Sequence, residues 1–192
     1  MRVGVLAIQG DVSEHIEALY NAADILRVST DDKVYSNFDV IAIRNKGVIP
    51  TCDGIVIPGG ESTTFCRLVK RKGLDAEIRN AAKSSMPILA TCAGLILLAK
   101  KGDKQVEISG QQLLGCLNVD VKRNAFGRQK ESFEISLQIE GIGTYTAVFI
   151  RAPAIVKAGD DVRVLATLDE YIVAVEQENI IALAFQIGRA HV

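Results

Sequence analysis

The chain has 192 residues, of which 48% are hydrophobic and 23% are charged, and its formal net charge is −1. This length is typical of a single domain that buries most of its apolar surface in one core. The small net charge argues against nucleic acid or an anionic membrane surface as the main partner.

No apolar run approaches the ~20 residues that a membrane-spanning helix needs, and the chain enters a strand-like pattern directly after Arg2, which leaves no room for a signal peptide. The four cysteines, at positions 52, 66, 92 and 116, form no C-x-x-C pair. This spacing favours a reducing compartment over a disulfide framework or a zinc site. We therefore expect a single-domain cytoplasmic protein with neither metal nor cofactor.

In the first half of the chain, short apolar runs alternate with segments of helical periodicity. Such alternation predicts a parallel sheet covered by helices on both faces. The polar stretch 25–39 is poorly periodic and indicates an irregular excursion or a short extra strand. The predicted strands are 3–8, 39–43, 54–58 and 87–90, and the predicted helices are 12–23, 62–70, 74–83 and 95–100.

In the second half, strand-like runs follow one another through short turns, which predicts an antiparallel extension of the sheet. The fold class is therefore α/β, a three-layer sandwich with a central, mostly parallel sheet and an antiparallel extension. The predicted strands here are 117–121, 131–139, 145–150, 163–167, 171–175 and 180–185.

Three loops follow predicted parallel strands, at 9–11, 58–62 and 92–94. Because ligands of open α/β sheets bind at the carboxyl ends of the strands, these loops predict an active site. Cys92 stands between a strand and a helix that opens with Ala93 and Gly94, the arrangement of a nucleophile elbow, where helix-start N–H groups favour the thiolate. A cysteine among apolar residues is more often a core residue, which is how we interpret the other three.

The Pro-Gly-Gly-Glu-Ser segment at 58–62 is by itself only a turn signal. Beside a cysteine elbow, its backbone N–H groups are candidates for an oxyanion hole, with Glu61 free to bind a substrate ammonium group. Arg123 and Arg151 each stand where a strand meets a loop, and each is either solvated surface or a contact to an anionic ligand.

A cysteine nucleophile normally needs a histidine within hydrogen-bonding reach. His15, on the first predicted helix, is interpreted as a surface or interface residue, and His191 lies next to the last residue. Neither is well placed to be the base.

Together these motifs resemble the glutaminase subunits of pyridoxal 5′-phosphate synthases, which are class I (triad) glutamine amidotransferases. The resemblance runs from residue 1 to about Phe185, interrupted mainly around 25–48, and the segments at 123–129 and 148–153 separate this family from other triad amidotransferases. The matching segments are VGVLAIQG at 3–10 with Glu14-His15, PGGESTT at 58–64, TCAGLILLAK at 91–100, RNAFGRQ at 123–129, SFE at 132–134 and VFIRAP at 148–153.

The resemblance implies that Cys92 attacks the side-chain amide of L-glutamine, forms a thioester and releases ammonia to a (β/α)₈-barrel synthase subunit that makes pyridoxal 5′-phosphate. It implies an oxyanion hole at Gly60 and Ala93, and it places Gln9 and the first helix on the partner-facing side. The substrate-binding residues that it implies are Gly59, Gly60, Glu61, Ser62, Arg123, Ile150 and Arg151.

The chain departs from the family after Phe185. The family ends its last core strand with Ser-Phe-His-Pro-Glu, which supplies the base and its orienting glutamate, followed by a terminal helix. Here Gln186 takes the base position and Gly188 the orienting position. Because glutamine does not accept and return a proton at neutral pH, we expect the chain as written to lack a complete triad. A non-catalytic scaffolding or regulatory paralogue is therefore the alternative, and a glutaminase of another pathway is disfavoured by the 123–129 segment.

We interpret residues 1–185 as the amidotransferase domain and 186–192 as a tail foreign to the family. The last six residues, IGRAHV, are what one frame of a widely used short-read sequencing adapter encodes before a stop codon. The two adapter bases that stand before this frame complete a glutamine codon when they follow a C. Histidine codons also begin with C, so a histidine codon interrupted after its first base would be read as glutamine. Resequencing the locus is expected to reveal His-Pro-Glu after Phe185. An intact genomic stop codon after Val192 would refute the interpretation.

Overall fold

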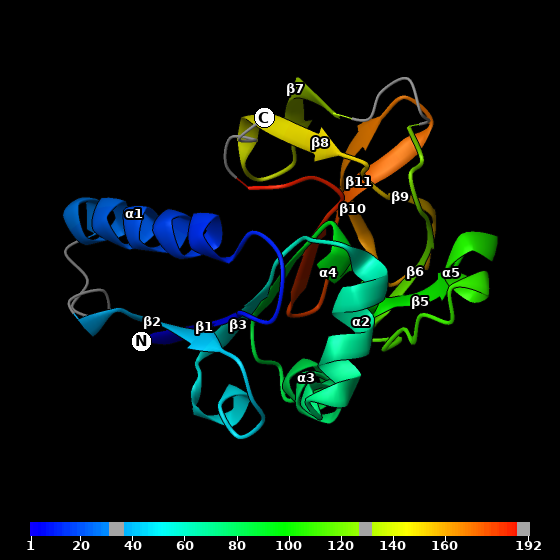
Figure 1. Ribbon diagram of the computed structural model, residues 1–192. Helices are drawn as coiled ribbons and strands as arrows, with labels where there is room; N and C mark the ends of the chain where they lie inside the picture. Colours follow the sequence, from blue (N-terminus) through cyan, green and yellow to red (C-terminus); the bar gives the residue numbers. More distant parts are fainter. Residues whose placement is uncertain (31–36, 127–131, 188–192) are drawn as a thin grey trace.

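The computed structural model describes residues 1–30, 37–126 and 132–187 (Figure 1). Its helices are α1 (Val12–Thr30), α2 (Ser62–Arg71), α3 (Leu74–Lys83), α4 (Ala93–Leu98) and α5 (Lys104–Ile108), with a 3₁₀ turn η2 (Ile49–Thr51). Its strands are β1 (Arg2–Leu6), β2 (Asp39–Ile43), β3 (Gly54–Ile57), β4 (Ile88–Thr91), β5 (Ala99–Gly102), β6 (Leu117–Lys122), β7 (Ser132–Ile139), β8 (Gly143–Ile150), β9 (Ala154–Ala158), β10 (Arg163–Leu168), β11 (Tyr171–Gln177) and β12 (Ile180–Leu183).

Ten of these strands form one sheet, in the order β2-β1-β3-β4-β12-β11-β9-β6-β5, with β10 paired to β11 off this path. The first five strands in this order are parallel, and β11 begins an antiparallel half in which β5 and β6 alone pair in parallel. β7 and β8 form a separate antiparallel hairpin. The predicted α/β fold, a mostly parallel sheet with an antiparallel extension, is confirmed.

Helices cover the two faces of the parallel half (Figure 1). On one face, α1 packs Ile16 and Leu19 against a small cluster of Val3, Val5 and Val56. On the other face, α2, α3 and α4 close the main core with fully buried side chains such as Phe65, Ile78 and Leu97. Since burying one large aliphatic side chain contributes about 1.5–3 kcal/mol, these layers hold the carboxyl ends of the parallel strands in fixed register.

Two segments differ from the sequence-based expectation. Residues 25–30 continue α1 instead of leaving it, because no helix-breaking residue intervenes and Asp24 pairs with Arg27 one turn later. The helix after Cys92 ends at Leu98, where Ala99 becomes extended (ψ 153°), so Ala99 and Lys100 belong to strand β5 rather than to a helix. Pairing with β6 supplies the hydrogen bonds that the helix would have made.

Two further elements, β9 and α5, had not been predicted. The start of α5 does carry a local signal, because Asp103 caps it by accepting hydrogen bonds from the N–H groups of Gln105 and Val106. β9 also carries a local signal, the short apolar run Ala154-Ile155-Val156 between Pro153 and Gly159. Its two neighbours, β11 and β6, come from distant parts of the chain.

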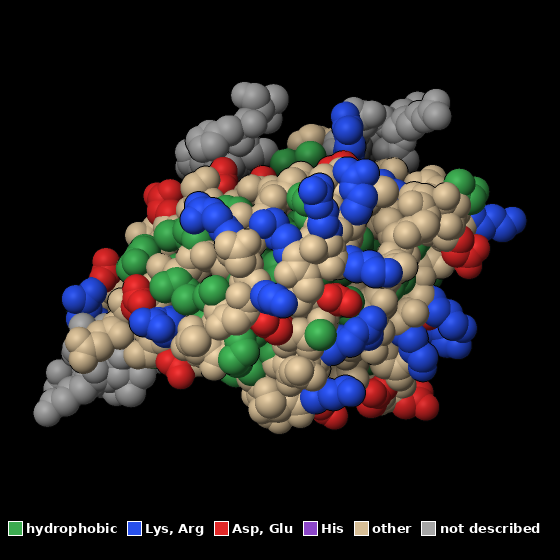
Figure 2. All heavy atoms as spheres, turned by 60° about the horizontal axis from the view of Figure 1, so that its bottom comes forward, with side chains coloured by type: hydrophobic (Ala, Val, Ile, Leu, Met, Phe, Trp, Pro, Cys, Tyr) green, Lys and Arg blue, Asp and Glu red, His purple; other side chains and the backbone are tan. Residues whose placement is uncertain are grey.

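Charged side chains of both signs share the face seen in Figure 2, where Lys and Arg gather near the middle. The outer side of α2 contributes exposed basic residues to the surface of the molecule, namely Arg67, Lys70 and Arg71. No helix in the described part of the chain is long and apolar enough to cross a membrane.

Gly94 is expected to be required for the packing of α4 on β3. A Cβ atom at Gly94 would lie 2.3 Å from the Ile57 carbonyl oxygen, a backbone atom that does not move away cheaply. Although alanine favours helix, we expect Gly94→Ala to lower the free energy of unfolding by about 2 kcal/mol or more in urea denaturation.

The matched control is Gly54→Ala, also at a buried glycine, where the added Cβ would meet its nearest neighbour, the Pro87 carbonyl oxygen, at an ordinary 3.4 Å. We expect it to cost less than about 1 kcal/mol. Equal losses in the two variants would contradict the packing argument.

Candidate active site

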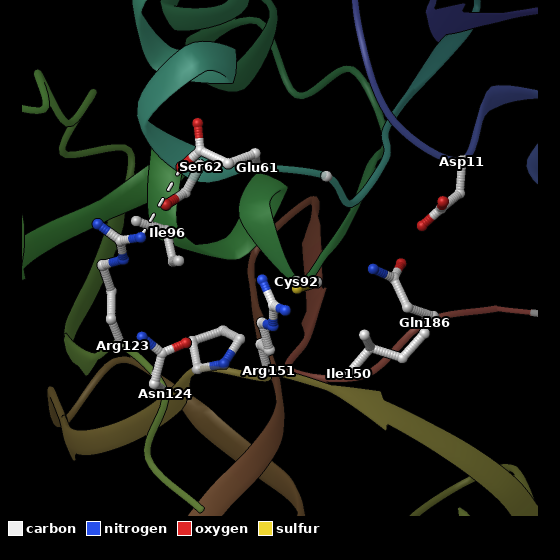
Figure 3. Close-up of a pocket in the computed structure, with 12 residues that line it drawn as sticks. Asp11, Glu61, Ser62, Cys92, Ile96, Arg123, Asn124, Ile150, Arg151 and Gln186 are labelled. Carbon is white, nitrogen blue, oxygen red and sulfur yellow. Dashed lines mark ion pairs between the residues drawn. The ribbon is translucent and has the colours of Figure 1, made fainter. Parts of the chain in front are cut away.

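The three loops predicted to converge do so at the carboxyl ends of β1, β3 and β4. The loop after β1 touches the loop after β3 directly, since a Cβ atom at Gly10 would fall 1.7 Å from the Gly59 carbonyl oxygen. Beside them lies a cavity of about 420 Å³ (Figure 3). Its lining residues are Asp11, Gly60, Glu61, Ser62, Cys92, Ile96, Arg123, Asn124, Ile150, Arg151, Pro153 and Gln186.

Cys92 occupies a sharp turn between β4 and α4, as predicted for a nucleophile elbow. Its backbone has φ 47° and ψ −101°, a conformation that non-glycine residues rarely adopt. The Cys92 N–H donates to the Leu183 carbonyl oxygen at 2.8 Å, and the Ile96 N–H donates to the Cys92 carbonyl oxygen at 3.2 Å. Strand β12 on one side and the first turn of α4 on the other therefore hold this strained residue in place.

Burial disfavours the charged form of the Cys92 thiol. Burial raises its pKa to about 12, and the nearby Asp11 carboxylate adds to the rise. Hydrogen bonds from the N–H groups of Ala93 and Gly60 act in the opposite direction but do not outweigh burial. The N–H groups thus favour the thiolate, as the sequence predicts, but desolvation outweighs them.

Gly60 and Ala93, the two residues expected at an oxyanion hole, both direct their backbone N–H groups at the Cys92 sulfur. Gly60 has φ 147°, a region open to glycine, and a Cβ atom there would lie 2.6 Å from Oε1 of Gln9. The Gln9 side chain thus packs on the Gly60 backbone. Its buried Oε1 has no hydrogen-bond partner among the described residues. Two N–H donors converging on one sulfur can also receive an oxygen that carries developing negative charge.

Glu61 is not free, in contrast to the sequence-based expectation. Its carboxylate caps α2 by accepting hydrogen bonds from the N–H groups of Thr63 (2.9 Å) and Thr64 (2.7 Å). Partial burial by itself would raise the pKa of Glu61, but these hydrogen bonds reverse the effect and lower it to about 2. Arg123 lies 3.8 Å from the same carboxylate (Figure 3) and donates to the Thr63 hydroxyl at 3.4 Å. The charged edge of the cavity is therefore built on the N-terminus of α2.

The remaining residues that the resemblance implied line the same cavity. Ser62 is buried as the first residue of α2, and Ile150 ends β8 with its side chain partly exposed. Arg151 follows with a strained backbone (φ 43°) and lines the same cavity as Cys92 (Figure 3). Segments far apart in sequence thus bring two carboxylates, of Asp11 and Glu61, and two guanidinium groups to the cavity that Cys92 lines.

Gln186 reaches the cavity from the end of β12. Its N–H donates to the Val148 carbonyl oxygen at 2.9 Å, and its side chain is 8% exposed and packs on the Cα of Gly59. Its Oε1 has no hydrogen-bond partner in the described part of the chain. The carboxamide therefore sits in the cavity that contains Cys92. Gly188 and His191 lie outside the described residues.

Two residues near Cys92 were missed or misjudged from sequence. Asp11 lines the cavity on the side of Gln186 (Figure 3), and burial and then Glu14 raise its pKa, which His15 partly offsets. His15 is not a surface residue, because it is only 1% exposed. The position of Asp11 directly after a parallel strand was the available signal for it, and for His15 the signal was its helical spacing from Val12 and Leu19, which places it on the apolar face of α1. Within the described residues, no cluster of His, Cys, Asp and Glu could hold a metal ion.

Comparison with known proteins agrees with this geometry. The sequence model of the SNO glutamine amidotransferase family matches residues 5–190. The chain is 54% identical to the pyridoxal 5′-phosphate synthase subunit PdxT of Methanococcoides burtonii over 186 residues, 96% of this chain and 90% of that protein. It is 48% identical to the PdxT subunit of Archaeoglobus fulgidus over 185 residues, 96% of this chain and 89% of that protein.

Solved structures agree as well. A glutamine amidotransferase crystal structure superposes with a TM-score of 0.79 at 39% identity, covering 96% of this chain and 89% of that one. The PurLQS structure from Thermotoga maritima, at 16% identity and a TM-score of 0.62, covers 96% of this chain and 86% of that one and shares the fold.

The cap at Glu61 predicts a pH dependence of stability. Because its pKa falls from 4.5 to about 2 on folding, the ionised carboxylate stabilises the fold above pH 4.5, and this contribution is lost as the pH falls from about 4.5 towards 2. We expect Glu61→Gln to lower the melting temperature at neutral pH and the difference from the parent chain to shrink steadily over that acidic window. The control is Glu170→Gln, at an exposed turn residue. A difference that stays constant from neutral to acidic pH would exclude the charged cap as its cause.

Proposed function

The chain belongs to the SNO glutamine amidotransferase family, and from this premise we propose that its site is built to hydrolyse L-glutamine to glutamate and ammonia through a thioester at Cys92. The ammonia would pass, in the cytoplasm, to the synthase subunit that makes pyridoxal 5′-phosphate. The observation that carries the proposal is the strained Cys92 elbow, whose sulfur receives the N–H groups of both Gly60 and Ala93.

The charges around the cavity suit an amino acid. Glutamine carries an α-ammonium group, an α-carboxylate and a neutral carboxamide. Arg123 and Arg151 supply positive charge for the carboxylate, and Glu61, held ionised by the α2 N-terminus, supplies negative charge for the ammonium. Ser62, Ile150 and the backbone at Gly59 and Gly60 complete the proposed substrate contacts. The carboxamide would then extend towards Cys92.

The proposed reaction has two steps. In the first, the sulfur of Cys92 attacks the carboxamide carbon, the carbonyl oxygen takes the negative charge between the Gly60 and Ala93 N–H groups, and the thiol proton leaves with the amide nitrogen as ammonia. In the second, water attacks the thioester, which releases glutamate and returns a proton to the sulfur. Both steps need a group that takes up a proton and gives it back.

Gln186 does not supply that group. A carboxamide neither accepts nor returns a proton at neutral pH, and the pKa of the Cys92 thiol is about 12, so the thiolate fraction without a base is very small. We therefore propose that the chain as written hydrolyses glutamine very slowly. The Gly188 position, where the family has the orienting glutamate, would leave even a restored base less well oriented.

The PdxT names of its relatives support a synthase partner for this chain. We propose a (β/α)₈-barrel subunit as that partner, with Gln9 and α1 on the facing side. Gln9 packs on Gly60, so a partner that contacts Gln9 would act one residue from the proposed oxyanion hole.

One observation favours a second candidate function. The carboxamide of Gln186 fills the region beside Cys92, which suits a scaffolding or regulatory paralogue that joins the complex without hydrolysing glutamine. A glutaminase serving another pathway is not supported by the relatives, which carry PdxT names.

Restoring the base is expected to restore activity. We expect negligible ammonia release from the chain as written, with or without the barrel subunit. Replacing residues 186–188 by His-Pro-Glu and adding the family's terminal helix should raise glutamine hydrolysis by ~10²-fold or more, because general acid–base catalysis contributes about 10²–10⁴-fold. Ammonia release in a coupled assay measures both.

The control is Cys92→Ala in the restored chain, which should return the rate to that of the chain as written. A restored chain that folds, binds the barrel subunit and still releases no ammonia would support the scaffolding function instead. Co-purification with the barrel subunit tests the partnership independently of chemistry.

A further inference from the structure

His15 joins two of the three loops that surround Cys92. It lies in the first turns of α1 and is 1% exposed. Its Nδ1 is 2.6 Å from the carbonyl oxygen of Asp11, in the loop after β1, and its Nε2 is 3.1 Å from the hydroxyl of Thr91, the last residue of β4. One buried ring therefore connects the loop after β1 to the end of β4, and His15 lies 76 residues before Thr91 in sequence.

The carbonyl partner of Nδ1 and the burial of the ring together indicate the direction of both hydrogen bonds. A carbonyl oxygen only accepts, so Nδ1 carries the proton and donates to Asp11. Burial lowers the pKa of the ring, against the opposing effects of the Asp11 carbonyl and the Asp11 and Glu14 carboxylates, so the imidazole is neutral. Nε2 then has a lone pair, and the Thr91 hydroxyl donates to it.

Both partners of His15 lie next to groups that determine the state of Cys92. Thr91 is fully buried and precedes Cys92, whose backbone is strained at φ 47°. Asp11 lines the cavity, and its carboxylate raises the pKa of the Cys92 thiol. A strained backbone conformation persists only where neighbouring groups hold it. The hydrogen bond of the Thr91 hydroxyl to His15 holds the residue immediately before Cys92.

We propose that His15 is a positioning residue, which by its two hydrogen bonds holds the Thr91–Cys92 elbow and the Asp11 loop at a fixed separation, so that the sulfur of Cys92 stays against the N–H groups of Gly60 and Ala93. The proposal deepens the proposed function, because it concerns the reactivity of the same cysteine. It assigns His15 no proton transfer to substrate.

The experiment measures the alkylation rate of Cys92 in the full chain with iodoacetamide, at mildly alkaline pH, by peptide mass spectrometry. Cys52, Cys66 and Cys116 serve as references in the same molecule. Thr91→Val keeps the shape of the side chain but removes the donor, Thr91→Ser keeps the donor, and His15→Leu removes both hydrogen bonds.

We expect Thr91→Val to slow alkylation of Cys92 about fivefold, the order expected for loss of one buried hydrogen bond, because the elbow relaxes away from the two N–H donors. His15→Leu, which removes both hydrogen bonds, should slow alkylation at least as much. The double variant should be no slower than the slower single variant, since both changes break the same contact. Thr91→Ser should stay within about twofold of the parent chain.

Three results would overturn the proposal: an unchanged Cys92 rate in Thr91→Val, additive effects in the double variant, or a parallel change at all four cysteines together with a lower melting temperature. If His15→Leu does not fold, Thr91→Val against Thr91→Ser decides alone. Alkylation requires no glutamine. If the alkylation rates of Cys92 change as expected but the restored chain does not hydrolyse glutamine, only the proposed function is rejected. If the restored chain is active but the alkylation rates do not change, only the role of His15 is rejected.

Discussion

The site depends on a backbone conformation at Cys92 that a cysteine adopts only under constraint. With φ 47° and ψ −101°, the residue turns the chain from β4 into α4 within one peptide unit. The constraint comes from the sheet, because β4 is hydrogen-bonded between β3 and β12, and from Gly94, which lets α4 approach the Ile57 carbonyl oxygen. Strain of this kind costs about 1–3 kcal/mol and is retained where it exposes a functional side chain.

The same burial that holds the elbow also disfavours the thiolate of Cys92. Desolvation raises the pKa of the Cys92 thiol to about 12 although two N–H groups favour the thiolate. A cysteine in such surroundings needs a neighbouring group that takes its proton before it can react as a thiolate. In this chain the position beside the cysteine belongs to Gln186, whose carboxamide has the shape of a hydrogen-bonding partner but not the basicity of one. A cavity can therefore have a shape that suits a ligand and still lack a group that transfers protons.

Charge around the cavity is arranged by secondary structure more than by individual side chains. Glu61 is ionised because it caps α2, and Arg123 lies against it, so a helix terminus determines where the acidic and basic groups meet. A simple count of charged residues would suggest that Glu61 is available to any cation. The structure gives it a structural role as well, since the carboxylate that faces the cavity also begins the helix.

Local pattern was enough to predict the alternation of strands and helices, the three loops after β1, β3 and β4 and the sharp turn at Cys92, because apolar periodicity and glycine-rich turns are readable over a few positions. It failed where distant segments decide. Ala99 leaves its helix to pair with β6, and the partner of His15 Nε2 is the hydroxyl of Thr91, 76 residues further along the chain. The protonation state of Cys92 was likewise beyond the sequence, since it is set by desolvation, and desolvation is a property of the packed tertiary structure around the sulfur.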